Sequence, residues 1–476
     1  MADVHITARA LAALLGDWRG PDAAYRSLAD RVRLLILDGR VPSDTRLPAE
    51  RDLAERLGLS RTTVTAAYRE LREGGYLDSL RGSGSVARLP GASPAVVPVR
   101  EHGALDFSKA AMPASALVTE ASVAAAARLP RYIAEFDYDP VGLPELRRAI
   151  AERYSEQGLP TSPDEIMVTL GAQHAIGLLA RTMVARGDRA LLEMPSYPHA
   201  HDALRTVGAR LVPVTVTSDH GWDEAEVTQA FERTNPVLAY LMPDFHNPTG
   251  ASMTERMRAT VRRSAARTGT VLVIDETTAD LSIDRSEPHR PFAADNTEGA
   301  RIITIGSLGK TVWGGLRIGW IRADRATIRK LVVARSVGDL GTPILEQLVS
   351  IELLPRLDEV IELRRAQLGA TRSRLEQLLA EHFPRWEVPH VSGGLAVWVG
   401  IGAPLSSQLA LAARSQGLVI AAGPRFGIDG AFERFLRLPI TYSLAETERG
   451  VEALRRAWGS LVRDPVPAMP DLAAVV

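Results

Sequence analysis

The sequence predicts two folded parts: an N-terminal α+β helix-turn-helix with a following hairpin, and a larger C-terminal α/β domain with a smaller α+β subdomain. Four short amphipathic helices lead into a hairpin with a glycine-rich tip near residue 84. Residues 89–105 are rich in Pro, Gly, Ala and Ser and have no periodic apolar face. Beyond them, apolar runs alternate with helical patterns, which is typical of a largely parallel sheet with helices on both faces.

At 476 residues the chain is too long for one ordinary hydrophobic core, so a multidomain protein is expected. The expected boundaries are residues 1–20 for a helical extension, 21–88 for the helix-turn-helix and hairpin, 89–105 for a linker, 106–464 for the C-terminal domain and 465–476 for a tail.

Each of the four N-terminal helices has one apolar face. Gly58 ends the third helix and Ser60 caps the fourth, so these two helices meet across the tight turn LGLS. The residues on the apolar faces are Leu11, Leu14, Leu15 and Trp18 in the first helix, Leu28, Val32, Leu35 and Ile36 in the second, Leu53 and Leu57 in the third, and Val64, Tyr68 and Leu71 in the fourth.

The stretch LPAERDLAERLGLSRTTVTAAYRELREGGYLDSLRGSGS resembles the winged helix-turn-helix of the GntR regulators. The resemblance implies binding to double-stranded operator DNA through the PAER motif, the start of the recognition helix and the tip of the wing. The residues at these positions are Arg51, Ser60, Arg61, Thr62, Thr63, Arg81 and Gly82.

Charge and helix geometry agree with this placement. The formal net charge of −1 excludes a globally basic nucleic-acid coat. Arg61 lies at the N-terminal end of the recognition helix, where its side chain can enter a major groove. Residues 22–88 hold 12 arginines against 10 acidic residues, so we expect DNA affinity to require a dimer. Any single arginine can equally be a solvated surface charge.

The C-terminal domain is expected to alternate strands and helices. Its compact apolar runs are RALLEM, VLAYLMP, GTVLVIDE and RIITIGSL. Its clearest helical stretches are LPELRRAIAERYSEQ and SMTERMRATVRRSAART. From about residue 345 a long helical pattern leads into a smaller unit with strands around GGLAVWVGI and RFLRLPIT.

Lysine is scarce in this chain, which contains three lysines and 53 arginines. A coding bias toward Ala, Arg and Gly explains part of this scarcity. A lysine amine can lose its proton and attack a carbonyl, whereas arginine stays protonated. Lys310, in the stretch SLGKTVWGGLRIGW, therefore hints at covalent chemistry, although a lone lysine is usually an exposed charge.

Residues 107 to 460 resemble fold-type I aminotransferases, which use pyridoxal 5'-phosphate (PLP). The resemblance is carried by FDYDPVGLPELRRAI, TLGAQHAIGLL, MPSYPHA, DFHNPTG, VLVIDETTADL, SLGKTVWGGLRIGW and FLRLPIT. It implies that Lys310 is the Schiff-base lysine, that Asp275 holds the pyridine nitrogen, and that Arg437 grips the carboxylate of a substrate or effector. The other implied cofactor contacts are Ala172, Gln173, Ser307 and Arg317 at the phosphate, Tyr197 on the ring face, Asn247 at the ring hydroxyl, and Tyr138, supplied to the phosphate by a partner subunit.

The sequence departs from this family at one position. The family usually places a tyrosine two or three residues after the aspartate, where its hydroxyl bonds the ring hydroxyl beside the imine. This chain has Thr277 and Thr278 there. The loss of that donor puts efficient proton transfer in more doubt than cofactor binding.

The two parts together resemble the MocR subfamily of GntR regulators. The resemblance implies a homodimer, in which the chains can exchange heads, that senses PLP or an amino acid or amine effector and regulates transcription. An active aminotransferase with a DNA-binding head would use the same site residues, and a PLP-binding buffer with a vestigial head is a third interpretation. The sequence leaves the effector, the target genes and the sign of regulation open.

The absence of cysteine excludes disulfides, thiolate zinc sites and cysteine nucleophiles, and we expect no metal site. The first 20 residues do not match a signal peptide, and no apolar run approaches the roughly 20 residues that span a bilayer. A cytoplasmic protein without membrane contact is expected.

Overall fold

A computed structural model describes residues 5–16, 18–19, 23–37, 41, 45–80, 84–88, 104–133, 138–285, 289–428 and 431–462. The chain divides into two units. Unit 1 comprises Met1–Phe107, Ile401–Leu436 and Arg449–Val476, and unit 2 comprises Ser108–Gly400 and Arg437–Glu448. The linker over residues 89–105 and the tail over 465–476 lie almost wholly outside the described residues, and the boundaries expected from the sequence stay predictions.

Unit 1 begins with the four expected helices. Their apolar faces meet in one core, in which Leu11, Val32, Leu53, Val64 and Tyr68 are buried. The helices are α1 (Ala8–Leu15), α2 (Ala24–Leu37), α3 (Glu50–Leu57) and α4 (Arg61–Glu73).

Gly58 and Ser60 shape the turn between α3 and α4. Gly58 adopts a left-handed conformation with φ 64°, which a glycine reaches without a steric penalty. The Ser60 hydroxyl accepts a hydrogen bond from the Thr63 backbone N–H at 3.1 Å and so caps α4. The helix-turn-helix expected from the sequence is therefore confirmed.

A two-stranded hairpin follows α4. Strands β1 (Leu77–Leu80) and β2 (Gly84–Ala87) pair antiparallel, with Leu77 opposite Ala87. This hairpin is the wing of the fold. Its tip, which includes Arg81 and Gly82, lies outside the described residues.

Unit 1 also contains short elements from the C-terminal part of the chain. Strand β3 (Leu105–Asp106) pairs in parallel with β13 (Leu418–Val419). Arg31 on α2 forms an ion pair with Glu433, which also accepts a hydrogen bond from the Ser407 backbone N–H at 3.0 Å. The other α-helix and strand from this part of the chain that lie wholly within this unit are α15 (Ser406–Ser415) and β14 (Ala421–Ala422), whereas β15 (Phe435–Pro439) and α16 (Leu444–Val462) each have residues in both units.

Unit 2 is built on an eight-stranded sheet with the order β4-β11-β10-β9-β8-β5-β6-β7. Five neighbouring strands run parallel: β10, β9, β8, β5 and β6. Strand β11 is antiparallel to both of its neighbours, β10 and β4, and β7 is antiparallel to β6. The expected largely parallel sheet is confirmed. The strands are β4 (Ile166–Thr169), β5 (Arg189–Met194), β6 (Arg210–Thr217), β7 (Gly221–Trp222), β8 (Leu238–Leu241), β9 (Val271–Asp275), β10 (Arg301–Ser307) and β11 (Gly319–Arg322).

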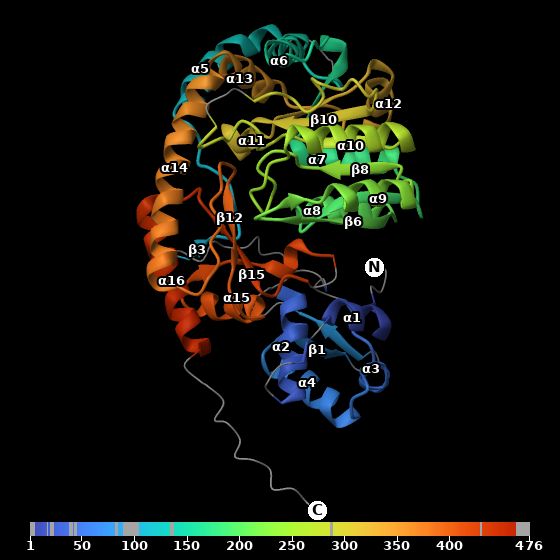
Figure 1. The fold of residues 1–476 in the computed structure, drawn as a ribbon, viewed down its shortest axis with the longest axis vertical. Helices are drawn as coiled ribbons and strands as arrows, with labels where there is room; N and C mark the ends of the chain where they lie inside the picture. The colour runs from blue at the N-terminus through green and yellow to red at the C-terminus, as the bar shows by residue number, and fades with distance from the viewer. Residues whose placement is uncertain are drawn as a thin grey trace, which may run out of the picture. The chain divides into compact units, whose positions relative to one another are not determined.

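Helices cover both faces of this sheet, as Figure 1 shows for unit 2. Because successive side chains of a strand point to opposite faces, Tyr240 and Val273 pack with α7 and α8, whereas Leu241 and Ile274 pack with α9 and α10. The helices around the sheet are α5 (Leu117–Arg128), α6 (Pro144–Glu156), α7 (Ala172–Met183), α8 (Pro198–Thr206), α9 (Glu224–Thr234), α10 (Glu255–Thr268), α11 (Leu308–Thr311) and α12 (Arg325–Arg335).

The long helical pattern after residue 345 forms two helices rather than one. Helix α13 (Ile344–Leu353) and helix α14 (Leu357–His382) are separated by a 3-10 turn over Leu354–Arg356. Pro355 lies in this turn, where its missing N–H and its ring interrupt the helical hydrogen bonds. The strand expected around GGLAVWVGI is β12 (Ala396–Gly400).

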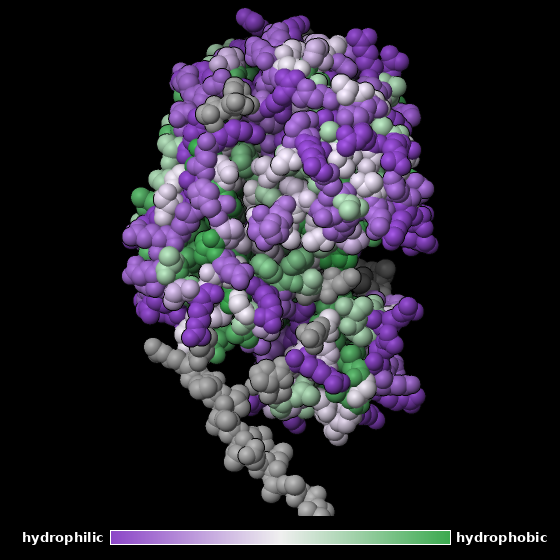
Figure 2. Space-filling view, viewed as in Figure 1, coloured by the Kyte–Doolittle hydropathy of each residue, from purple (hydrophilic) through white to green (hydrophobic). Residues whose placement is uncertain are grey.

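The outward faces of the helices in unit 2 are largely polar. Figure 2 shows a mainly hydrophilic surface where α6, α10 and α12 lie. Among the helices that the structure describes, none is both long enough and apolar enough to span a membrane.

Candidate functional site

The parallel strands β9 and β10 bring two of the predicted site segments together. Ile305 lies opposite Asp275 in the strand register, so β9 and β10 end at neighbouring positions. Helix α11 begins directly after Ser307 and carries Lys310. The carboxyl ends of parallel strands are the usual ligand-binding edge of such sheets.

Lys310 has a largely buried amine. Its Nζ donates a hydrogen bond to the backbone carbonyl of Ala110 at 3.1 Å. Burial lowers the pKa of the Lys310 amine, the positive charge of Arg437 lowers it further, and the Asp275 carboxylate opposes both effects. A lowered pKa makes the neutral, nucleophilic amine more accessible than in a solvated lysine.

Asp275 ends β9 and is 4% exposed. Its Oδ1 accepts a hydrogen bond from the Thr277 backbone N–H at 3.0 Å, and its Oδ2 accepts one from the Tyr240 hydroxyl at 2.6 Å. Burial raises the pKa of the Asp275 carboxyl, and the two hydrogen bonds oppose that shift. A buried carboxylate held in this way is suited to pair with a cation or a protonated ring nitrogen.

Arg437 and Asn247 meet in the same unit. Arg437 Nη1 donates to the Asn247 side-chain oxygen at 3.3 Å, and its Nη2 donates to the backbone carbonyl of Ser108. Burial lowers the pKa of Arg437 to about 10, so the guanidinium keeps its charge at neutral pH. A buried guanidinium can form a bidentate ion pair with a carboxylate.

A tight turn presents Asn247. The His246 N–H donates to the Ala251 carbonyl at 2.8 Å, and the Gly250 N–H donates to the His246 carbonyl at 2.7 Å. Gly250 has φ 74°, and a Cβ atom at this position would lie 2.5 Å from Val391 Cγ1. The turn therefore requires glycine at this position for both conformational and steric reasons.

Three of the predicted phosphate contacts, Ala172, Gln173 and Arg317, lie at the start of α7. Gly171 precedes the helix with φ 81°, and Ala172 and Gln173 are its first residues. Arg317 Nη2 donates to the Leu170 carbonyl at 2.7 Å. A Cβ atom on Gly319 would lie 2.9 Å from Ala172 N, so glycine allows this close approach. The first N–H groups of a helix and a nearby guanidinium together favour an anion.

Ser307 caps α11 beside this cradle. Its hydroxyl donates to the Ile318 carbonyl at 2.9 Å and accepts a hydrogen bond from the Gly309 N–H at 2.9 Å. Ile318 follows Arg317 directly in the chain, so Ser307 is held next to the segment that carries the guanidinium.

The two predicted tyrosines differ in their surroundings. Tyr197 is half-buried at the start of α8, and its ring lies edge-on to His199 with 5.3 Å between centroids. Tyr138 is 74% exposed and is not part of the buried cluster around Lys310.

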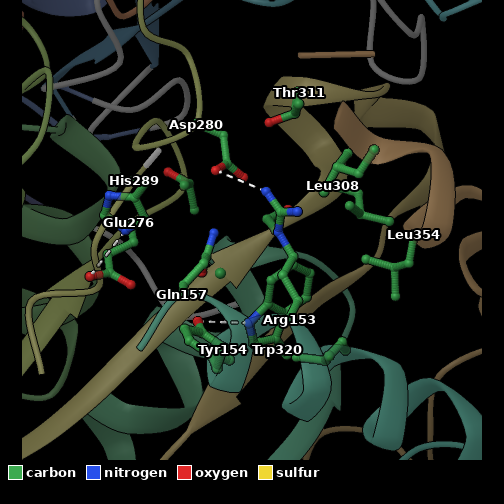
Figure 3. A pocket seen from close by; sticks show the side chains of 15 residues that line it. Arg153, Tyr154, Gln157, Glu276, Asp280, His289, Leu308, Thr311, Trp320 and Leu354 are labelled. Atoms are coloured by element: carbon green, nitrogen blue, oxygen red, sulfur yellow. Dashed lines mark hydrogen bonds and ion pairs between the residues drawn. The ribbon is translucent and has the colours of Figure 1, made fainter. Parts of the chain in front are cut away.

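Thr277 and Thr278, which stand where the family has a tyrosine, have different partners, and a hydrogen bond from the Thr277 side chain opposes the rise that burial causes in the pKa of Asp275. The Thr278 hydroxyl donates to the Asp244 carbonyl at 3.1 Å. Thr277 lines a cavity of about 30 Å³ that Glu276, His289 and Arg153 also line (Figure 3). This volume holds one or two water molecules.

Glu276 points away from the site, as the alternation along a strand requires. Its carboxylate accepts a hydrogen bond from the Phe292 N–H at 2.7 Å and lies 3.6 Å from His289 Nε2. Figure 3 shows Glu276 and His289 side by side, with the Arg153–Asp280 ion pair on another wall of the cavity. Ser307, a predicted phosphate contact, also lines this cavity, whereas Lys310 and Arg437 are not among its lining residues.

Sequence reasoning missed Tyr240, which touches Asp275 from the neighbouring strand β8. A tyrosine inside a strand as apolar as VLAYL was a usable signal, because a buried phenol hydroxyl needs a hydrogen-bond partner. The backbone carbonyls of Ser108 and Ala110, which accept from Arg437 and Lys310, carried no such signal.

The predicted DNA contacts lie at the start of α4 and on α3. Arg51, Ser60, Arg61 and Thr62 are exposed, and Thr63 is half-buried. The Ser60 hydroxyl lies 2.7 Å from those of both Thr62 and Thr63. Their side chains are therefore held at the helix N-terminus, where a DNA phosphate or base edge can bind.

Two family models match the chain and define its class. The model of aminotransferase class I and II matches residues 115–454, and the model of bacterial regulatory proteins of the gntR family matches residues 24–86. The chain belongs to the aminotransferase class I and II family and carries a GntR DNA-binding head, which implies DNA binding.

Its relatives include regulators of the same architecture. The uncharacterized HTH-type transcriptional regulator YdcR of Escherichia coli (strain K12) is 27% identical over 471 residues, which cover 92% of this chain and 99% of YdcR. The probable rhizopine catabolism regulatory protein MocR of Rhizobium meliloti is 32% identical over 62% of this chain and 64% of that protein. The chain is a MocR-type transcriptional regulator.

The body also resembles an enzyme. The 2-aminoadipate transaminase of Thermus thermophilus is 30% identical over 74% of this chain and 89% of that protein. The crystal structure of LysN, an alpha-aminoadipate aminotransferase from the same organism, complexed with N-(5'-phosphopyridoxyl)-L-leucine, has a TM-score of 0.70 and 29% identity. The matched region covers 76% of this chain and 93% of LysN. The aminotransferase fold expected from the sequence is confirmed.

Proposed function

We propose that this regulator binds pyridoxal phosphate through Lys310 and that the bound cofactor, with an amino acid or amine effector, changes its affinity for operator DNA. The observation that carries the proposal is that Lys310 and Asp275 lie at or just beyond the carboxyl ends of the parallel strands β10 and β9, with the buried Arg437 of β15 close enough to lower the Lys310 pKa, in a chain with a GntR head. The proposal would lack support if Lys310 were fully exposed or if the Asp275 carboxylate were buried without a hydrogen-bond partner.

The residues present fit this cofactor. PLP supplies an aldehyde that reacts with amines and a ring that withdraws electrons. The Lys310 amine would hold the aldehyde carbon, and the Asp275 carboxylate would hold the proton on the pyridine nitrogen. The start of α7, with Ser307 and Arg317, would bind the phosphate.

Two further side chains would complete cofactor binding. Tyr197 would cover the ring face, and Asn247 would contact the ring hydroxyl. Asn247 already accepts a hydrogen bond from Arg437 at 3.3 Å, so an effector carboxylate on Arg437 would lie beside the cofactor ring. Effector binding would therefore be sensed at the turn that holds Asn247.

The effector class follows from Arg437. A buried guanidinium that stays charged at neutral pH favours a carboxylate, so amino acids are better candidates than simple amines. The amino acid derivative in the LysN structure and the substrate in the name of the related transaminase support an amino acid as the ligand of this fold.

We also propose a homodimer that shares its cofactor sites. Tyr138 is 74% exposed, and Ile133 and Val123 are 71% and 70% exposed. Exposed apolar side chains favour an interface where they form one contiguous patch. A partner subunit bound there would bring its Tyr138 to the phosphate cradle, in line with the resemblance noted for FDYDPVGLPELRRAI.

A direct test measures cofactor binding and DNA binding on the same variants. PLP should give wild-type protein and Lys330→Ala an absorbance band near the visible edge, and should give Lys310→Ala none. Lys330 is an exposed lysine on α12 and serves as the matched control. In gel shifts on the protein's own upstream DNA, at a stated salt concentration, PLP should change wild-type affinity roughly 5- to 150-fold and leave Lys310→Ala unchanged.

Two results would contradict the proposal. If wild-type protein stays colourless with PLP, the proposed cofactor binding is wrong. If PLP does not change the affinity of wild-type protein for DNA, the proposed regulation is wrong. An active aminotransferase with a DNA-binding head remains the second candidate, because the 30% identical relative is a transaminase. Incubation with PLP, amino acids and 2-oxoglutarate separates the two, since multiple fast turnovers would establish the enzyme.

A further inference from the structure

We infer that Tyr240 is a positioning residue of the cofactor site: its hydroxyl holds the Asp275 carboxylate in the orientation that receives the pyridine nitrogen. The inference rests on the proposed binding of PLP. It assigns a role to a side chain that neither the motifs nor the family resemblance singled out.

The sheet places Tyr240 beside Asp275. Strands β8 and β9 run parallel, and Tyr240 lies opposite Val273, two residues before Asp275. Residues two apart on a strand point to the same face, so Asp275 shares the face of Val273 and Tyr240. The Tyr240 hydroxyl donates to Asp275 Oδ2 at 2.6 Å, a distance typical of a hydrogen bond to a charged oxygen.

Tyr240 remains a hydrogen-bond donor at every physiological pH. It is 2% exposed, and burial together with the Asp275 charge raises the pKa of its phenol well above 10. The Thr277 N–H donates to Asp275 Oδ1, and a hydrogen bond from the Thr277 side chain also favours the ionised carboxylate. A carboxylate oxygen accepts more than one hydrogen bond, so the group fixed in this way can still bind a protonated nitrogen.

The residues that follow Asp275 also support this role for Tyr240. Of the two threonines that replace the family's tyrosine, Thr278 donates to the Asp244 carbonyl, and Thr277 hydrogen-bonds Asp275 and lines the cavity shown in Figure 3. The tyrosine hydroxyl that contacts Asp275 in this chain comes from strand β8, whereas the family's tyrosine lies in the segment after the aspartate. The Tyr240 hydroxyl acts on the carboxylate and not on the ring hydroxyl.

The substitution Tyr240→Phe removes this hydroxyl and keeps the ring. Tyr154→Phe is the matched control, because the Tyr154 hydroxyl is also buried and accepts one hydrogen bond, from Trp320 Nε1 at 3.0 Å, without touching Asp275. PLP dissociation constants are measured by absorbance titration, and the bound absorbance band is followed from pH 6 to 9. Circular dichroism and melting curves establish folding for both variants.

We expect Tyr240→Phe to bind PLP about tenfold more weakly, equivalent to about 1.4 kcal/mol, and to shift the pH midpoint of the bound band. Tyr154→Phe should match the wild-type protein in both readouts. In an Asp275→Asn background, Tyr240→Phe should cause no further loss of PLP affinity, since the two residues act through one contact.

Three other outcomes would each contradict a stated part of the inference. Wild-type affinity and an unchanged pH midpoint in Tyr240→Phe would overturn this inference and leave the proposed function intact. Loss of the folded state in Tyr240→Phe would assign the hydroxyl to structure and overturn the inference as well. Failure of the wild-type protein to bind PLP would overturn the proposed function and, with it, this inference.

Discussion

At the scale of single residues, the candidate site is a set of charged groups kept out of water. Asp275 and Arg437 are buried and Lys310 is half-buried, and desolvation shifts each pKa toward the neutral form. Such groups cost folding free energy unless a partner compensates them. A half-buried lysine together with a buried aspartate and arginine, all with shifted pKa values, is a pattern typical of functional sites.

Asp275→Asn should separate stability from binding. The folded pKa of Asp275 is raised, so the folded state holds its proton to a higher pH than the unfolded chain does. Above that folded pKa the ionised carboxylate destabilises the cofactor-free protein, and the effect disappears as pH falls to about 3.8. We expect cofactor-free Asp275→Asn to melt at a higher temperature than wild type at pH 8, with a gap that narrows as the pH falls through the folded pKa toward 3.8.

The same substitution should weaken PLP binding by roughly 10- to 100-fold, as expected for a lost hydrogen bond to a charged group. Calorimetry across pH measures the first effect and absorbance titration the second. A lower melting temperature for cofactor-free Asp275→Asn at pH 8 would show that the carboxylate stabilises the fold instead.

At the scale of elements, the start of a helix is used twice. In unit 2 the first residues of α7 face Arg317 and the predicted phosphate position, and in unit 1 the first residues of α4 carry the predicted DNA contacts. Both helices begin after a residue that the local conformation requires, Gly171 with φ 81° and Ser60 with its side-chain cap. The exposed N–H groups at such ends attract phosphate in either setting.

Arg61→Ala should lower operator affinity by about 1–3 kcal/mol, because Arg61 lies at the N-terminal end of α4 and can form a bidentate contact with guanine. Arg69→Ala is the matched control, since Arg69 lies on the same helix, is exposed and pairs only loosely with Glu73, at 4.0 Å. Fluorescence anisotropy on operator and scrambled DNA measures both variants. Equal losses on the two DNAs would indicate phosphate contact rather than base recognition.

At the scale of the whole molecule, the proposal requires two chains. Tyr138, a predicted phosphate contact, is 74% exposed within one chain, whereas Lys310 is half-buried. A shared site explains both observations, because the partner subunit would cover Tyr138 and bring its hydroxyl to the cofactor.

Hybrid dimers test this arrangement. Tyr138→Ala and Lys310→Ala chains should each bind PLP poorly, with about a tenfold loss for Tyr138→Ala from one missing phosphate hydrogen bond. If the sites are shared, a refolded mixture should regain one intact site in each hybrid dimer, seen as recovered absorbance and tight PLP binding. A mixture no better than the average of the two variants would place Tyr138 in its own chain's site.

The sequence by itself determined the local elements. Side-chain periodicity, the Gly58 and Ser60 signals and the alternation of apolar runs are properties of neighbouring residues, so the winged head and the largely parallel sheet could be predicted. Family motifs placed Lys310, Asp275 and Arg437 in one site. The break at Pro355 was also encoded locally, because proline removes an N–H wherever it lies.

Only the tertiary structure decided which residues from distant segments meet. Tyr240 reaches Asp275 because β8 and β9 are paired in one register, and Arg437 reaches Asn247 from a strand far along the chain. Backbone carbonyls such as that of Ala110 carry no residue-specific signal, since every residue has one. Burial, which sets the pKa values of these groups, likewise arises only when the segments pack together.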